Sequence, residues 1–429
     1  MMTQQQALNF STTIPAHAFH KPDVGISLIH LLLPKGSDHD VVPIFAARAL
    51  RGFADGFVAV LLPVYLLALG LGGVEVGAIA TATLLGSALA TLAMGAWGHR
   101  WTGRALLLGA AALMAVTGLG FAAVSSFWPL LVVAFVGTLN PSSGDVSLFL
   151  PLEHARLAVA SDAPARTALF ARYALTGALC AALGALASGL PDRVVALSGI
   201  QRLDALRGMF VLYGLIGILI GVLYRKLPAD DAVDPARPAA LGPSRAVVVK
   251  LAALFSVDSF AGGMVVNSLL ALWLFQRFGL SLAAAGAFFF GSGLLGATSQ
   301  LAAPNLAKRI GLVNTMVFTH IPASLCLIAA AFSTDVRWAL GLLLARALVS
   351  SMDVPARSAF VMSVVQPHER SAAASFTAVP RSLAAAVSPL LAGWLFQSGW
   401  TATPLVICGV LKIAYDLALW RAFRLFKHV

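Results

Sequence analysis

Twelve stretches of about twenty apolar residues follow one another along this chain of 429 residues. They lie near 43–70, 76–97, 105–124, 127–150, 167–190, 208–226, 247–275, 282–303, 313–333, 338–364, 372–398 and 402–423. An α-helix of about 20 apolar residues crosses the hydrocarbon core of a bilayer, and a helix satisfies its backbone hydrogen bonds within the segment itself. The sequence therefore predicts an all-α, polytopic membrane protein with twelve transmembrane helices.

The composition agrees with a chain that is surrounded by lipid. Hydrophobic residues make up 59% of the chain and charged residues 11%, whereas soluble domains carry roughly 25% charged residues. The formal net charge of +11 would suggest nucleic acid as the partner of a soluble protein, but a polytopic protein concentrates Lys and Arg in its short cytoplasmic loops. We therefore expect the lipid bilayer, and not nucleic acid, as the partner.

The three cysteines and nine histidines show no metal-ligand spacing, so no metal site is expected.

Polar segments divide the chain. Residues 1–42 form a tail without the apolar core and cleavage site of a secretory signal. Residues 227–246 include "LPADDAVDPARPAALGPSR", which is typical of a flexible linker, and they separate a half at 43–226 from a half at 247–424, followed by a short tail at 425–429. With both termini in the cytoplasm, seventeen Lys and Arg lie inside and five outside. This bias predicts cytoplasmic termini and a multi-pass protein of the bacterial inner (plasma) membrane.

The two halves carry the same landmarks in the same order. "GLGGVEVG" at 70–77 corresponds to "GLSLAAAG" at 279–286, and "SSGDV" at 142–146 corresponds to "SSMDV" at 350–354. Arg172 follows Asp145 by 27 residues, and Arg381 follows Asp353 by 28. Six spans in each half bring both copies into the membrane from the same side, so the repeat is parallel, about an axis along the membrane normal.

This arrangement resembles the major facilitator superfamily, over residues 41–426. The loop "GAWGHRWTGR" is similar to the signature of that family, roughly G-x-x-x-D-R-x-G-R, although a histidine stands where the family usually has its acid. The matching positions, and the basic positions opposite them in the second half, are Gly95, His99, Arg100, Gly103, Arg104, Lys308 and Arg309. The resemblance implies two pseudo-symmetric six-helix bundles that rock about a central cavity.

Charged residues inside the predicted spans are expensive, at about 2.5–3.5 kcal/mol each on insertion scales, and must face the bundle interior or a water-filled cavity. The bases are Arg48, Arg51, Arg172, Arg346, Arg357, Arg381 and Lys412, and the acids are Asp55, Asp145, Asp258, Asp353 and Asp416. Spacing of four residues predicts three pairs that share a helix face, which are Arg51 with Asp55, Asp353 with Arg357, and Lys412 with Asp416.

The repeated charges suggest a gate near the cytoplasmic ends of the spans. We expect Asp145, Arg172, Asp353 and Arg381, with Arg357 beside them, to pair when the cavity opens outward and to separate when it opens inward. Static bridges within each half, which would only orient helices, explain the pattern equally well.

Four residues are candidates for the central cavity. Asp55 and Asp258 hold corresponding places in the first and seventh spans, which line the cavity in the family that this chain resembles. Asp258 has no basic residue within a turn of its own helix and is the candidate proton site. Arg346 would hold a substrate anion or serve as counter-ion for Asp258, and Asn267 would add a hydrogen bond.

The chain has no P-loop, ATP-binding domain or cofactor motif, so we expect no cofactor and an ion gradient, first of all protons, as the energy source. The resemblance implies a monomeric secondary transporter of a small molecule, first of all a proton-coupled exporter of drug-like or toxic compounds, and not an enzyme. An organic-anion carrier is the alternative within the class. An intramembrane enzyme that uses Asp145 and Asp353, or a non-transporting sensor, is the alternative from another class.

Overall fold

The computed structural model describes residues 41–142, 147–160, 163–228, 242–366 and 369–424, and every regular element within these ranges is helical. The first half contains α2 (Val41–Ala68), α3 (Gly73–Trp97), the 3-10 helix η2 (Gly98–Arg100), α4 (Gly103–Ala123), α5 (Phe127–Val136), α6 (Phe149–Val159), α7 (Ala163–Ala187), α8 (Leu190–Ser198) and α9 (Arg202–Arg225). The second half contains α10 (Arg245–Gly263), α11 (Asn267–Phe278), α12 (Leu282–Ile310), α13 (Leu312–Phe332), α14 (Val336–Ser350), α15 (Asp353–Val364), α16 (Arg370–Gln397) and α17 (Thr403–Phe423). Both tails, except for Val41 and Val42, and most of the expected linker lie outside the described residues.

Eleven helical segments among the described residues are long and apolar enough to cross a membrane, one fewer than the twelve spans expected. The difference lies in the fourth expected span, 127–150, which forms the short helices α5 and α6. Asn140 and Pro141 stand between them, where Pro141 lacks a backbone donor and the Asn140 side chain accepts a hydrogen bond from Ser142 N at 3.2 Å. Spans seven and ten are also interrupted, at 264–266 and at 351–352.

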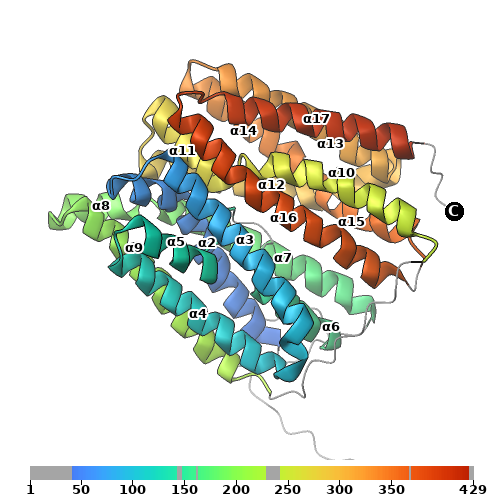
Figure 1. The fold of residues 1–429 in the computed structure, drawn as a ribbon, viewed down its shortest axis with the longest axis horizontal. Helices are drawn as coiled ribbons and strands as arrows, with labels where there is room; N and C mark the ends of the chain where they lie inside the picture. Colours follow the sequence, from blue (N-terminus) through green and yellow to red (C-terminus); the bar gives the residue numbers. More distant parts are fainter. Residues whose placement is uncertain (1–40, 143–146, 161–162, 229–241, 367–368, 425–429) are drawn as a thin grey trace, which may run out of the picture.

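The two halves pack their helices in the same pattern (Figure 1). In the first half α2 packs on α7, α4 on α9, and α3 on α5; in the second half α10 packs on α16, α13 on α17, and α12 on α14. Each pair joins the same span positions of its own half. The internal repeat that the sequence predicts is therefore present as a repeated set of helix contacts.

The halves meet along α3 with α16 and along α7 with α12. Glycines bring α3 and α16 together, since a Cβ on Gly393 would lie 2.3 Å from Gly73 O and a Cβ on Gly77 would lie 2.5 Å from Pro389 O. Val74 N also donates to Gln397 Oε1 at 2.7 Å across this interface. These contacts lie at the end of the molecule that holds α8, which we call the α8 end (Figure 1).

The opposite end, where α6 and α15 lie, is called the α6 end. Buried residues of α3 stop at Ala88, and Leu89 and Leu92 are 43% and 39% exposed. A pocket of about 150 Å³ lies here between α3, α6 and α16, with Thr91 and Ser382 in its lining. In Figure 1 the ribbons of α3 and α16 diverge toward this end. The halves are therefore closed against each other at the α8 end and partly open at the α6 end.

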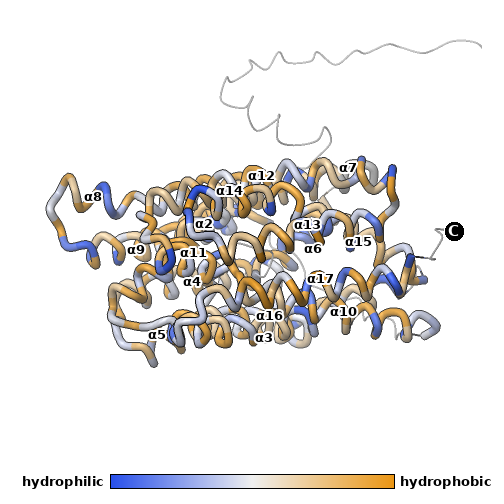
Figure 2. Tube along the Cα trace, turned by 90° about the horizontal axis from the view of Figure 1, so that it is seen from above, coloured by the Kyte–Doolittle hydropathy of each residue, from blue (hydrophilic) through white to orange (hydrophobic). Residues whose placement is uncertain are grey.

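The hydropathy of the surface follows the helix axes. Figure 2 shows apolar residues along most of the helix lengths, with hydrophilic residues mainly near the turns at both ends. Large apolar side chains such as Val116, Trp128 and Phe318 are exposed on the outside, at 64%, 73% and 55%. A surface of this kind is stable when lipid tails cover it.

Candidate functional site

Asp258 on α10 lies at the centre of a buried charge cluster in the second half. Lys412 of α17 donates to Asp258 Oδ1 at 2.6 Å, and Arg357 of α15 donates to Asp258 Oδ2 at 3.0 Å. Asp258 is only 5% exposed. The expectation that Asp258 lacks a basic neighbour holds along its own helix but is wrong in space, because two bases reach it from other helices.

His320 of α13 lies between two carboxylates. Its Nδ1 is 3.2 Å from Asp416 Oδ1, and its Nε2 is 4.0 Å from Asp258 Oδ1 and 3.3 Å from Lys412 Nζ. The expected pair of Lys412 with Asp416 is therefore wrong, since Lys412 binds Asp258 and Asp416 faces His320. Asp416 Oδ2 is buried without a hydrogen-bond partner among the described residues. Sequence reasoning missed His320, although it is the one histidine within the twelve expected spans.

Arg357 joins this centre to the expected gate. Its Nη1 lies 3.7 Å from Asp353 Oδ2 as well as 3.0 Å from Asp258 Oδ2. The expected pair of Asp353 with Arg357 is thus present, but it is shared with Asp258. In this conformation the expected gate and the expected coupling site of this half are in contact, because one guanidinium lies beside both acids.

Arg381 of α16 completes the cluster. Its Nε donates to Ser259 Oγ at 3.2 Å, and its guanidinium lies 5.9 Å from the centre of the Phe255 ring. No ion pair joins Arg381 to Asp353 within the described part of the chain. We call the following set the Asp258 cluster: Asp258, His320, Asp353, Arg357, Arg381, Lys412 and Asp416. It holds three carboxylates and three basic side chains, with the His320 ring between two of the carboxylates.

A second buried cluster lies in the first half and is centred on Arg51 of α2. Arg51 Nη2 donates to Glu153 Oε2 at 2.6 Å and Arg51 Nη1 donates to Glu153 Oε1 at 3.1 Å. Tyr224 donates to Glu153 Oε1 at 2.6 Å, and Tyr173 donates to Glu153 Oε2. We call these four residues the Arg51 cluster. Arg51 thus binds an acid from another helix, while Asp55, the expected partner on its own helix, also lies close enough to interact with it electrostatically.

Sequence reasoning missed Glu153 because it lies beyond the apolar stretch at 127–150, where no transmembrane helix was expected. The signal was present in "FLPLEHARLAV", in which apolar residues recur at helical spacing around one acid. The structure places this segment on α6, where Glu153 is 0% exposed. A buried acid on a short helix needs donors, and two tyrosines and one arginine supply them.

Of the other charged residues expected in the first half, the structure describes Asp55 and Arg172 but not Asp145. Asp55 is buried on α2, near Arg48, Arg51 and Asn140. Asp145 lies outside the described residues, so its expected pairing with Arg172 has no structural counterpart here. Arg172, on α7, has no ion pair with any acid in the described ranges.

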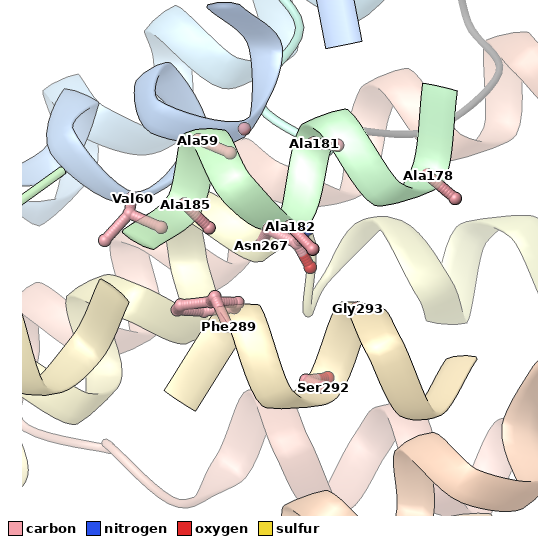
Figure 3. Close-up of a pocket in the computed structure, with 11 residues that line it drawn as sticks. Ala59, Val60, Ala178, Ala181, Ala182, Ala185, Asn267, Phe289, Ser292 and Gly293 are labelled. Carbon is pink, nitrogen blue, oxygen red and sulfur yellow. The ribbon is translucent and has the colours of Figure 1, made fainter. Parts of the chain in front are cut away.

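A small cavity lies between the two halves (Figure 3). Its volume is about 150 Å³, and its walls are mostly alanine and glycine residues of α2, α7 and α12. Asn267, the first residue of α11, lines it together with Ser292 and Phe289 of α12. Figure 3 shows Asn267 between α7 and α12. Among the described residues the Asn267 amide has no hydrogen-bond partner, so it is available to a bound molecule.

Arg346 of α14 is half-buried and lies near the thiols of Cys326 and Cys408. It is not within 4.0 Å of any described carboxylate, and the counter-ions of Asp258 are Lys412 and Arg357. The expected role as counter-ion of Asp258 is therefore not seen in this conformation. An unpaired guanidinium inside a membrane protein remains a candidate for binding an anion.

The signature-like loop joins α3 to α4 at the α6 end. Residues 98–100 form η2, and Thr102 Oγ1 accepts a hydrogen bond from Ala105 N at 3.2 Å and so caps α4. Gly95 and Arg100 are exposed, Gly103 is buried, and Arg104 is partly exposed, while the side chain of His99 lies outside the described part. The corresponding bases of the second half, Lys308 and Arg309, lie in the last turn of α12.

Known proteins resemble this chain over most of its length. The family model of the Major Facilitator Superfamily matches residues 44–349 and 251–425. The uncharacterized membrane protein YJR124C of Saccharomyces cerevisiae is 23% identical over 421 residues, which cover 90% of this chain and 94% of that protein.

Two solved structures show the same fold. A bacterial homologue of the human lysosomal transporter Spinster, in an inward-facing and occupied conformation, matches with a TM-score of 0.70 and 14% identity, over 90% of this chain and 96% of that one. A D-xylose-proton symporter matches with a TM-score of 0.69 and 16% identity, over 89% and 97%.

Proposed function

This chain belongs to the Major Facilitator Superfamily, a family of membrane transporters, and we propose that it exports a small drug-like or toxic organic solute in exchange for protons. In this proposal the protein is a monomer in the plasma membrane of a bacterium, with both termini in the cytoplasm. The transported solute binds in the cavity between the halves, and the proton binds in the Asp258 cluster. No cofactor takes part, because the proton gradient supplies the energy.

The observation that carries the proposal is the position of His320 between Asp258 and Asp416. With a neutral imidazole the cluster holds three negative and three positive side chains, and one added proton gives it a net positive charge. Buried charge costs free energy in a medium of low dielectric, so a proton on this cluster changes which ion pairs are favourable. Protonation of Asp258 itself would remove the charge that holds both Lys412 and Arg357.

The cluster is linked to the cavity through one span. Asp258 lies on α10, and the same span continues after the break at 264–266 into α11, which begins with Asn267. Release of Asp258 from Arg357 of α15 would free α10 to shift relative to α15. Such a shift would move Asn267 in the cavity wall. Proton binding at Asp258 would in this way change the solute site.

The closed α8 end and the partly open α6 end fit one step of alternating access. In the proposed orientation the α6 end faces the cytoplasm, so this conformation is inward-open. Asp258 is paired with both bases here, as expected after it has released its proton to the cytoplasm. The solute would then bind from the cytoplasm, and a proton from outside would reset the carrier.

Flux measurements in proteoliposomes test the function and its direction. A panel of cationic, neutral and anionic solutes would be loaded with and without a pH gradient, and empty liposomes would serve as the control. We expect a neutral or cationic organic solute to move against its gradient when protons move the opposite way. If no solute responds to the pH gradient, or if solute and protons move in the same direction, proton-coupled export is wrong.

Arg346 favours a second candidate, a carrier of an organic anion. Its guanidinium is inside the membrane and has no ion pair with a described acid, so a carboxylate or sulfonate of a substrate would be its partner. In that case Arg346→Gln would weaken the binding of anionic solutes about thirtyfold or more and leave neutral solutes unaffected, because truncation of one partner of a buried charge pair costs about 2–5 kcal/mol. Equal flux of anions in the parent and in Arg346→Gln would exclude this candidate.

A further inference from the structure

Two open pockets lie at equivalent places of the repeat, both at the α6 end and both away from the cavity of Figure 3. The α3–α4 pocket has a volume of about 470 Å³, and Met94, Trp97, Arg100, Trp101 and Leu106 are among its lining residues. The α12–α13 pocket has a volume of about 430 Å³, and Pro304, Lys308, Leu312 and Pro355 are among its lining residues. Each pocket lies where the second span of a half turns into the third.

The chemistry of the two pockets is the same. Each lining contains one basic side chain, Arg100 or Lys308, and its other members are apolar. No carboxylate lies in either lining, and neither basic side chain forms an ion pair with an acid in the ranges that the structure describes. An exposed cation above an apolar wall is suited to a ligand that has an anionic head and an apolar body.

The position of the α3–α4 pocket matches a membrane interface. Trp97 and Trp101 are each 54% exposed, at the end of an apolar helix that is long enough to cross the bilayer. Tryptophan is enriched at the level of lipid headgroups, because its ring is apolar and its N–H is polar. Basic pockets between membrane helices bind the headgroups of anionic lipids.

We propose that each of these two pockets binds the headgroup of one anionic phospholipid, with the phosphate at Arg100 in the α3–α4 pocket and at Lys308 in the α12–α13 pocket. The first carbons of the acyl chains lie against Met94 and Leu106 in one pocket and against Leu312 and Pro355 in the other. Both volumes are within the usual range of about 300–1,000 Å³ for a small-molecule site. The proposal requires only that the chain spans a membrane and does not rest on the proposed export function.

Native mass spectrometry of the full-length protein tests the proposal. The protein would be delipidated in detergent and titrated with phosphatidylglycerol or with phosphatidylcholine of the same acyl chains. We expect two retained phosphatidylglycerol molecules, each bound about fivefold or more tightly than phosphatidylcholine, as one basic side chain near an anionic headgroup predicts. Arg100→Gln and Lys308→Gln should each remove one of the two, and the double variant should remove both.

The neighbouring bases supply matched controls. Arg104, in the first turn of α4, and Arg309, in the last turn of α12, lie outside the pocket linings, so Arg104→Gln and Arg309→Gln should retain both lipids. Arg100→Lys keeps the charge and should retain its lipid, which separates loss of binding from loss of folding. Equal losses in the Arg104 or Arg309 variants would overturn the proposal in favour of diffuse surface charge.

Two further outcomes would also overturn it. If phosphatidylcholine binds as tightly as phosphatidylglycerol, the pockets do not select anionic headgroups. If inorganic phosphate in excess displaces phosphatidylglycerol from the parent protein, the pockets are sites for a soluble anion and not for a lipid. Bound phosphatidylglycerol that resists inorganic phosphate supports the lipid, because the apolar walls then contribute to the affinity.

Discussion

Removal of the charge of Glu153 should destabilise the protein far more than removal of a surface acid. In Glu153→Gln the shape of the side chain is kept, but Arg51 stays buried, at 2% exposed, without its anionic partner. Tyr173 and Tyr224 also lose a charged acceptor. Loss of one partner of a buried ion pair costs about 3–5 kcal/mol, because the other charge is left uncompensated.

The assay is the free energy of unfolding in mixed micelles, as the fraction of denaturing detergent increases. The control is Asp204→Asn, since Asp204 is 57% exposed and pairs with Arg207 at 3.4 Å on the surface. That variant should lose less than about 1 kcal/mol. The double variant Arg51→Gln with Glu153→Gln should recover part of the loss, because no buried charge then lacks a partner. A loss below about 1 kcal/mol for Glu153→Gln would refute the description of the Arg51 cluster as a buried, fully bonded ion pair.

Three further variants test the packing, the cavity and the second cluster. Gly393→Ala should destabilise the contact of α3 with α16 because its Cβ would lie 2.3 Å from Gly73 O, whereas Gly341→Ala, with no atom within 4 Å, should match or slightly exceed the parent in thermal stability. Asn267→Ala should raise the KM for transport about five- to tenfold, because the solute loses one hydrogen bond of about 1–1.5 kcal/mol, and it should leave the stability of the protein unchanged. An unchanged KM would show that Asn267 does not bind the solute. Lys412→Met should lower the free energy of unfolding by several kcal/mol, because Asp258 stays buried without this partner. The double variant Lys412→Met with Asp258→Asn should recover part of that loss, and no recovery would contradict the pairing of these two residues.

Much of the fold could be predicted from the sequence, because its signals are local or periodic. The apolar stretches predict where membrane-crossing helices lie, and the repeated landmarks predict that the halves share one pattern of contacts. The fourth span was the exception. α5 ends at Val136 with the extended residue Gly137 as its C-cap, and the unbroken apolar stretch did not show that α6 forms a separate helix.

The partners of the buried charges could not be predicted. Spacing along one helix predicts neighbours one turn apart, and it identified Asp353 with Arg357 correctly. Packed helix axes are only about 8–10 Å apart, so long side chains such as Arg51 and Lys412 reach acids on other helices just as easily. Sequence spacing contains no distance between helices, and for this reason Glu153 and His320 were missed.

The most direct test of proton coupling compares gradient-driven transport with exchange in the same proteoliposomes. Parent protein, Asp258→Asn and His320→Gln would be measured for solute flux with a pH gradient and for solute exchange at equal pH, with Asp204→Asn as the surface control. We predict that the parent and Asp204→Asn respond to the gradient, and that Asp258→Asn and His320→Gln lose that response while they keep exchange. Parent flux that ignores the gradient, or an Asp258→Asn variant that responds as the parent does, would contradict the assignment of the proton to the Asp258 cluster.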